Sequence, residues 1–188
     1  MLELVELGQK TQGIIVCGLN GSGKTTLGRA LAKVLNFKFI DIEDYHFHES
    51  AIAYSNPRTK EEALALMLAD IKKYTSFVIC TVNGAYLGEE ILSKCNVVTY
   101  LTAPQKDRIK RVEQRLYDQF GERIHVGGDM YEQESKFLQY VAARSEAPIE
   151  EWLKTIEYPI IPIDGMEDYK KNAVKIAQLY KEYIDSEL

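Results

Sequence analysis

One eight-residue segment near the start of the chain constrains the fold more than any other feature. Residues 18–25 read Gly-Leu-Asn-Gly-Ser-Gly-Lys-Thr and match the pattern G-x-x-x-x-G-K-[ST]. The segment follows a short apolar run at 13–17, which predicts a strand, and precedes apolar residues at helical spacing over 27–35. Glycines in such a turn let backbone N–H groups surround phosphate oxygens, and the start of the helix adds partial positive charge. The segment therefore predicts a nucleoside-triphosphate site, with a plain glycine-rich turn as the alternative.

The motif gives an expected role to each of its residues. Lys24 is expected to reach the β- and γ-phosphates, and the Thr25 hydroxyl is expected to hold Mg²⁺. ATP and Mg²⁺ are therefore the expected cofactors. The residues expected to bind the nucleotide here are Gly18, Asn20, Gly21, Ser22, Gly23, Lys24, Thr25 and Thr26.

Short apolar runs alternate with amphipathic segments along the chain. Each run has four to six residues that are mostly β-branched or aromatic, as expected for strands buried on both faces. Alternating strands and helices predict an α/β fold with a doubly wound, parallel, five-stranded sheet of the P-loop NTPase or nucleotide-kinase type. The predicted strands are 13–17, 37–40, 77–82, 97–101 and 160–163.

A long segment between the fourth and fifth predicted strands contains no strand of its own. A helix is expected to begin near Asp129 and Glu132 within this segment, residues 117–157. A helical insertion at this place in an open α/β sheet predicts a lid over the carboxyl ends of the strands. Because the chain has 188 residues, we expect one domain, residues 1–188, that carries this lid.

The charge balance excludes some classes of partner. The chain has 23 Lys and Arg against 28 Asp and Glu, for a net charge of -5. This balance argues against a general nucleic-acid binder and against attraction to an anionic membrane. Glu3 and Glu6 stand where a signal peptide would carry positive charge, and the three cysteines form no CxxC pair. We therefore expect a cytoplasmic protein with a small-molecule partner, and the oligomeric state stays open.

The missing motifs and the positions of the acidic residues indicate which class of phosphate-loop protein the sequence fits. No N-K-x-D or L-S-G-G-Q motif is present, and the D-x-x-G match at 118–121 falls at the end of a predicted helix. The third predicted strand has no terminal Asp. Carboxylates instead follow the second predicted strand, at Asp41, Glu43 and Asp44. A carboxylate near both the metal and an attacking hydroxyl is what phosphoryl transfer needs, although a solvated acidic turn is the alternative.

With this placement the sequence resembles the small P-loop kinases of metabolites and nucleotides, the group that holds shikimate kinase, gluconate kinase and adenylate kinase. In shikimate- and gluconate-type members an Asp-x-Asp pair follows the second strand and serves Mg²⁺ and the acceptor hydroxyl. Asp41 and Glu43 occupy the matching positions here. The resemblance implies that Thr25 and Asp41 hold the metal, and that Lys24, Asp41 and Glu43 are catalytic.

The resemblance also covers weaker motifs further along the chain. Residues 102–104 and the arginines after them look like the start of the lid in these kinases. By this resemblance Arg111 would stack against the adenine and Arg115, a catalytic candidate, would approach the phosphates. Asp164 and Gly165 resemble the turn that borders the adenine, although they also fit an ordinary turn.

Other polar residues are candidates for the acceptor side. Arg123 and Arg144, with Arg115, are candidates to neutralise charge on the moving phosphoryl group. Arg58 sits where these kinases often place an arginine that grips an acidic group of the acceptor, and Asp44 is a further acceptor candidate. For each arginine, an ion pair at the surface is the alternative.

The segment after the third predicted strand departs from the known patterns. Residues 82–86 read Val-Asn-Gly-Ala-Tyr, neither the glycine run of shikimate kinases nor the Asp-Gly-Phe-Pro-Arg run of adenylate kinases. Asn83 and Gly84 are still expected to line the acceptor side, because they leave a strand beside the phosphate loop. His46 and His48 have no third partner nearby, which argues against zinc. Aromatic residues that could form a wall for a base or sugar, or could simply be buried, are Tyr45, Phe47, Tyr54 and Tyr86.

These observations predict an ATP-dependent phosphotransferase that acts on a small hydroxylated or nucleotide-like acceptor. A nucleotide-binding regulatory module, or a slow ATPase without a small-molecule acceptor, is the alternative. A kinase that acts on an RNA or protein end is a third possibility, which the acidic charge balance disfavours.

Overall fold

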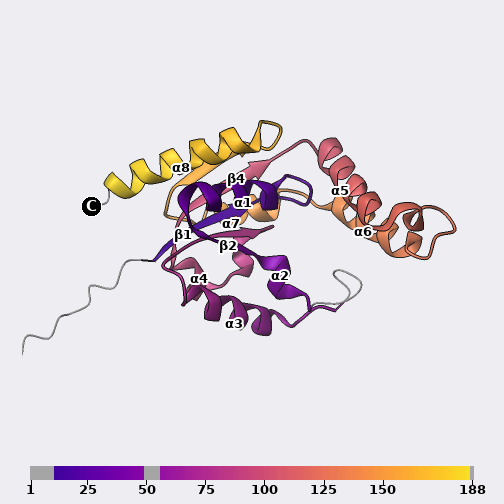
Figure 1. Ribbon diagram of the computed structural model, residues 1–188, viewed down its shortest axis with the longest axis horizontal. Helices are drawn as coiled ribbons and strands as arrows, with labels where there is room; N and C mark the ends of the chain where they lie inside the picture. Colours follow the sequence, from indigo (N-terminus) through magenta and orange to yellow (C-terminus); the bar gives the residue numbers. More distant parts are fainter. Residues whose placement is uncertain (1–10, 49–55, 187–188) are drawn as a thin grey trace, which may run out of the picture.

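The computed structural model describes residues 11–48 and 56–186 (Figure 1). Five strands form one sheet in the order β2-β3-β1-β4-β5, and every neighbouring pair is parallel. The predicted doubly wound parallel sheet is therefore confirmed. The strands are β1 (Gln12–Cys17), β2 (Lys38–Asp41), β3 (Ser76–Thr81), β4 (Cys95–Thr102) and β5 (Ile160–Asp164).

Helices connect the strands, as the alternating pattern predicts. Two short 3₁₀ turns, η1 (Gly84–Tyr86) and η2 (Gly121–Ile124), accompany them. Helix α3 begins with the capping box of Thr59 and Glu62, in which each side chain accepts a hydrogen bond from the other residue's backbone N–H. The helices are α1 (Lys24–Leu35), α2 (Ile42–His46), α3 (Lys60–Ile71), α4 (Glu89–Leu92), α5 (Gln105–Phe120), α6 (Tyr131–Ala143), α7 (Ala147–Leu153) and α8 (Tyr169–Ser186).

Alternate residues of the buried strands face two separate hydrophobic clusters. Helices α1 and α8 cover one face of the sheet, where Leu31 and Ile176 are buried against Val16. Helices α3, α4 and α7 contribute to the cluster on the other face, where Met67 and Trp152 belong. Because both faces are covered, the strands read as nearly continuous apolar runs in the sequence.

Strand boundaries differ from the predicted ones by one or two residues. Strand β2 ends at Asp41 instead of at residue 40, because Asp41 still pairs with Cys80 of β3. The Asp41 side chain then accepts a hydrogen bond from the Glu43 N–H at the start of α2. A polar residue thus ends the ladder and begins the next helix, so apolar runs alone place this boundary too early.

Helices α5 and α6 extend side by side away from the sheet (Figure 1). We call the segment from α5 through η2 to α6, residues 105–143, the helical arm. Its own apolar cluster contains Val112, Leu116 and Val141, with Phe120 packed against them. The helical segment expected at 117–157 also includes α7, but α7 lies against the sheet through Ile149 and Trp152. The lid function of the arm stays a prediction.

The strand order brings several loops to one edge of the sheet. Strand β1 lies between β3 and β4, so the segments that leave these parallel strands emerge together at their carboxyl ends. This edge receives the phosphate loop at 18–25, the carboxylates after β2, the 82–86 segment and the base of the helical arm. Within residues 11–48 and 56–186, no helix is both long and apolar enough to span a membrane.

Candidate active site

The phosphate loop, residues 18–25, leaves β1 through glycines in a conformation that other residues rarely adopt. The φ angle is 79° at Gly21 and 105° at Gly23, in the left-handed region. A Cβ atom at Gly21 would overlap the backbone carbonyl of Arg108. In the described part of the chain, the N–H groups of Gly21 and Gly23 have no hydrogen-bond partner, and neither does the buried Ser22 Oγ. These donors suit the oxygens of a phosphate group.

Lys24 and Thr25 begin α1 and face the carboxylate that ends β2. The Thr25 Oγ1 donates a hydrogen bond of 2.8 Å to Asp41 Oδ2, and Asp41 is 7% exposed. The Lys24 Nζ donates to the Leu19 carbonyl at 3.1 Å. Burial lowers the pKa of Lys24, while the carboxylates of Glu43 and Asp41 oppose that shift. The site thus combines two features. One is the Lys24 ammonium, which has few protein acceptors nearby, and the other is the hydrogen-bonded pair of the Thr25 hydroxyl and the Asp41 carboxylate.

The two other carboxylates after β2 have different surroundings. Glu43 is half-buried and lines a cavity of about 740 Å³. Asp44 is more exposed and is not among the residues that line this cavity. Burial raises the pKa of Asp44, the nearby Asp41 raises it further, and Arg29 opposes both. Of these two carboxylates, Glu43 is therefore the one placed to meet a molecule in the cavity.

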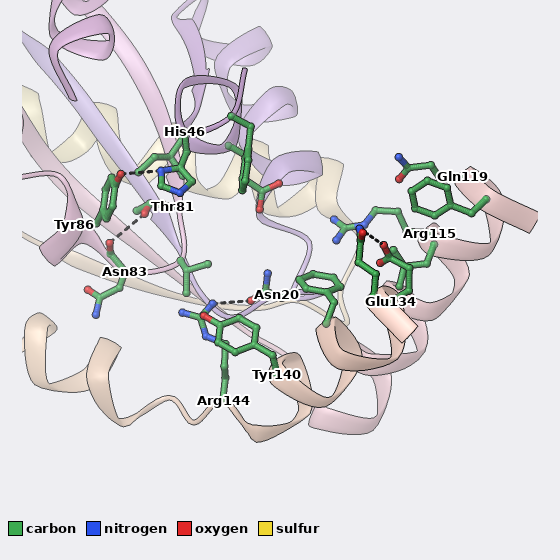
Figure 2. A pocket seen from close by; sticks show the side chains of 18 residues that line it. Asn20, His46, Thr81, Asn83, Tyr86, Arg115, Gln119, Glu134, Tyr140 and Arg144 are labelled. Atoms are coloured by element: carbon green, nitrogen blue, oxygen red, sulfur yellow. Dashed lines mark hydrogen bonds between the residues drawn. The ribbon is translucent and has the colours of Figure 1, made fainter. Parts of the chain in front are cut away.

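The cavity lies between the edge of the sheet and the helical arm. Figure 2 shows His46, Asn83 and Tyr86 on one side of it and Arg115 and Glu134 on the other. The His46 Nδ1 and the Tyr86 hydroxyl share a hydrogen bond of 3.0 Å. Other residues that line the cavity are Asn20, Ile42, Phe47, Thr81, Val82, Leu116, Gln119, Phe120, Gln133, Phe137, Tyr140 and Arg144.

Two of the predicted arginines line this cavity. Arg144 follows α6, and its Nη1 donates to the Asn20 Oδ1 of the phosphate loop at 3.0 Å. The Arg144 guanidinium also lies over the Tyr140 ring, 5.1 Å from the centroid. Arg115 lies on the exposed side of α5, and within the described residues it forms no ion pair or hydrogen bond.

Two other predicted arginines do not line the cavity. Arg123 pairs with Asp129 at the tip of the arm, with the closest N–O distance 2.6 Å. The Arg58 Nη1 donates to the backbone carbonyls of Tyr45 and Phe47, at 3.0 and 2.6 Å. The acceptor roles of Arg58, Arg123 and Asp44 stay predictions.

A second, smaller pocket lies on the other side of the phosphate loop. It has a volume of about 210 Å³, and Ser22, Thr26, Arg111 and Gly165 line it. The Arg111 guanidinium donates to the carbonyls of Gly21 and Ser22 at 3.3 Å and to that of Gly165 at 3.0 Å. Asp164 caps this turn by accepting from the Met166 N–H. Arg111 and Gly165 therefore line this pocket together, with Asp164 in the adjoining turn, and the role of all three on the nucleotide side stays a prediction.

The segment after β3 is held in place by α7. The Asn83 Nδ2 donates to the Pro148 carbonyl at 2.9 Å, while Asn83 also lines the large cavity. Gly84 is buried, and a Cβ atom there would overlap the Trp152 ring. Gly84 thus allows α7 to approach η1 and does not itself line the cavity.

Two buried charged residues of the arm were not among the predicted site residues. Arg108 is 4% exposed, and its guanidinium donates to the carbonyls of Ala103 and Asn20 at 3.1 and 3.4 Å. Glu134 is 6% exposed and lines the large cavity. Both lie on the apolar face of their helices. A charged residue at such a position is the sign in the sequence that could have identified them.

The oxygen donors at this edge suit Mg²⁺ better than a transition metal. Over the described ranges, no group of three or more His, Cys, Asp or Glu side chains could hold a metal ion. Mg²⁺ is usually bound by only one or two carboxylates together with waters and substrate phosphates. The Thr25 hydroxyl beside the Asp41 carboxylate fits that donor set.

Comparisons with known proteins agree with this geometry. The sequence model of the shikimate kinase family matches residues 20–144, well over half of the chain. The chain is 31% identical over 117 residues to a shikimate kinase of Clostridium botulinum, and this alignment covers 57% of this chain and 68% of that protein. The chain belongs to the shikimate kinase family. It is therefore a P-loop kinase of small molecules, and this family generally uses ATP and Mg²⁺.

One further relative and two solved structures resemble the chain over most of its length. An uncharacterized protein of Bacillus subtilis, YqaC, is 26% identical over 163 residues, 81% of this chain and 88% of that protein. The solved shikimate kinase of Acinetobacter baumannii, in complex with shikimate, covers 93% of this chain and 96% of its own, with a TM-score of 0.53 and 20% identity. A gluconokinase of Sinorhizobium meliloti has a TM-score of 0.53 and 16% identity, covering 95% of this chain and 98% of its own. These structural likenesses support the kinase fold alone.

Proposed function

We propose that this P-loop kinase transfers the γ-phosphoryl group of Mg-ATP to a hydroxyl of a small acceptor bound in the large cavity. The observation that carries the proposal is the 2.8 Å contact between Thr25 and Asp41, next to Glu43 at the wall of a cavity of about 740 Å³. A nucleotide-binding module without an acceptor would not need a carboxylate facing so large a cavity.

The residues of the loop would bind and orient the phosphates. The N–H groups of Gly21 and Gly23 and the Lys24 ammonium supply positive charge without neighbouring protein acceptors competing strongly for it. Thr25 and Asp41 would hold Mg²⁺, which supplies charge neutralisation when bound. Arg115 faces the cavity without an ion pair in the described residues and is available for the moving phosphoryl group.

The acceptor hydroxyl would be oriented by Glu43. As its oxygen bonds to the γ-phosphorus, the bond from that phosphorus to the bridging oxygen of ADP breaks, and the hydroxyl proton passes to a Glu43 carboxylate oxygen. Asp41 is less free to take this proton, because it already accepts hydrogen bonds from Thr25 and from the Glu43 N–H. Asn83 and Arg144 line the same cavity and would position the acceptor.

The experiment compares carboxamide variants in an assay of ADP formation with a panel of nucleosides, nucleotides, sugars and hydroxy acids. Glu43→Gln is expected to lower kcat by about 10²- to 10⁴-fold, the usual contribution of a positioned base. Asp41→Asn is expected to lower turnover far more than ATP affinity, and Lys24→Ala to abolish transfer. Glu89→Gln, at an exposed position of α4, is the matched control and should keep full activity.

The pattern of losses separates the possible roles. Full phosphotransfer by Asp41→Asn would refute its metal role, and a loss confined to Asp44→Asn would move the base to Asp44. If no compound in the panel raises ADP formation by the unmodified protein above background, the regulatory module or slow ATPase is the better reading.

A further inference from the structure

A buried carboxylate of the helical arm faces the large cavity. Glu134, in the first turn of α6, is 6% exposed and lines the cavity. Within the described residues it has one hydrogen-bond donor, the Gln133 Nε2 at 3.0 Å, and no ion pair. A carboxylate offers about four acceptor positions, so most of this capacity is unused by the protein.

Several apolar side chains line the cavity that Glu134 faces. The apolar residues Leu116, Phe120 and Phe137 line the same cavity on α5 and α6, and Leu116 belongs to the buried cluster of the arm. A buried charge in apolar surroundings carries a large free-energy cost unless it is paired or hydrogen-bonded. The unused positions of Glu134 therefore fit a ligand that donates hydrogen bonds.

The other charged groups of the cavity have separate tasks. Arg144 is bound to Asn20 of the phosphate loop, and Glu43 lies next to the proposed metal pair. Arg115 lies on the same side of the cavity as Glu134 in Figure 2, but the two form no ion pair within 4.0 Å. If Arg115 serves the phosphoryl group, Glu134 remains as the acidic group that an acceptor meets on the arm.

We infer that the acceptor is a nucleoside whose base donates N–H groups to Glu134. This inference rests on the proposed function and names the substrate class of the same cavity. The aromatic side chains Phe120 and Phe137 line the same cavity and would stack on a planar base, and such stacking is worth about 1–3 kcal/mol per base. A hydroxyl of the sugar would then be the group offered to Glu43.

Glu134 disfavours an acceptor that carries a carboxylate near the arm. Shikimate and gluconate are both carboxylates, and a like charge beside a buried Glu134 would cost free energy in a medium of low dielectric constant. An amino sugar shares the N–H chemistry of a nucleoside but has no planar ring for the aromatic side chains. The aromatic lining therefore favours the nucleoside.

The test measures binding directly, by calorimetry with the full chain and a nonhydrolysable ATP analogue. The probes are the four ribonucleosides, N4,N4-dimethylcytidine and N6,N6-dimethyladenosine, glucosamine, and shikimate with gluconate. At least one nucleoside with an exocyclic amino group is expected to bind about 10- to 100-fold more tightly than its dimethyl derivative, as for a hydrogen bond to a charged group. Glu134→Leu should abolish this preference, and Glu134→Gln should weaken it.

Controls separate recognition from loss of folding and from an effect on Arg115. Glu132→Gln, exposed on the same helix, should leave nucleoside affinity unchanged. Thermal unfolding of each variant reports whether it folds, and Glu134→Gln keeps the size of the side chain. A fall in kcat that is equal for every acceptor after Glu134→Gln would indicate that Glu134 positions Arg115, and would overturn the inference.

The remaining outcomes distinguish this inference from the proposed function. Glu134-dependent nucleoside binding without ADP formation would support recognition of a nucleoside by Glu134 and would contradict the phosphotransferase proposal. Phosphorylation of shikimate, gluconate or glucosamine without nucleoside binding would support the proposal and overturn the inference. Absence of binding by all four nucleosides also overturns it.

Discussion

The contact between Gly84 and Trp152 gives a sharp test of how the cavity is built. Gly84 is buried in η1, its backbone conformation allows alanine, and an added Cβ atom would overlap the six-membered ring of Trp152. Trp152 is 7% exposed and belongs to the hydrophobic cluster on the face of the sheet that α3, α4 and α7 cover, so it has little room to move away. Overpacking of this kind costs about 1–3 kcal/mol. Gly84→Ala is therefore expected to lower the free energy of unfolding by that amount.

The assay is urea and thermal unfolding of a double-mutant cycle. For a chain of this length, about 1–3 kcal/mol corresponds to a fall in Tm of about 2–12 °C. Trp152→Phe removes the ring atoms nearest to Gly84, so Gly84→Ala should cost little in that background and the coupling energy should be about 1–3 kcal/mol. Because η1 contains Tyr86 and follows Asn83, the single variant should also raise the KM for the acceptor more than that for ATP. Equal costs of Gly84→Ala in both backgrounds would refute the steric argument.

Two further predictions concern titratable groups outside the proposed chemistry. Burial raises the pKa of Cys17 to about 12 and that of Cys95 to about 12. Both thiols should therefore react with a disulfide reagent at pH 8 far more slowly in the folded protein than in urea. Rapid labelling of the folded protein would contradict their burial. Hydrogen bonds from Lys73 and Tyr45 lower the pKa of Asp70 from 3.8, so its contribution to stability is present above that pH and is lost as the pH falls further. Asp70→Asn should therefore flatten the fall in the urea midpoint between about pH 5 and pH 3, and an unchanged slope would argue against this linkage.

The sequence was sufficient where the signal is local. Residues 18–25 combine a specific motif with a strand before it and a helix after it, and the structure has β1 and α1 at those places. Each buried strand is a continuous apolar run because both faces of the sheet are covered, so the five strands could be located within one or two residues. The clustering of Thr25, Asp41 and Glu43 then follows from the parallel topology.

The remaining parts of the site depend on contacts between distant segments. The position of Glu134 depends on how α6 lies against α5, and the role of Gly84 depends on Trp152, far along the chain. A charged residue on an apolar helix face is the local sign of such a contact, and both Arg108 and Glu134 show it. Arg58 illustrates the opposite case, because it lies outside any helix and no residue pattern identifies the backbone carbonyls that it binds.

The arginines at the base of the arm have a consequence for the energetics of nucleotide binding. Arg108 and Arg111 donate to the carbonyls of Asn20, Gly21 and Ser22 on the outer side of the phosphate loop. The carbonyl and N–H of a planar peptide unit point in opposite directions, so holding the carbonyls outward also fixes the direction of the N–H groups. The protein therefore meets the cost of orienting the loop when it folds, and an arriving nucleotide finds preorganised dipoles.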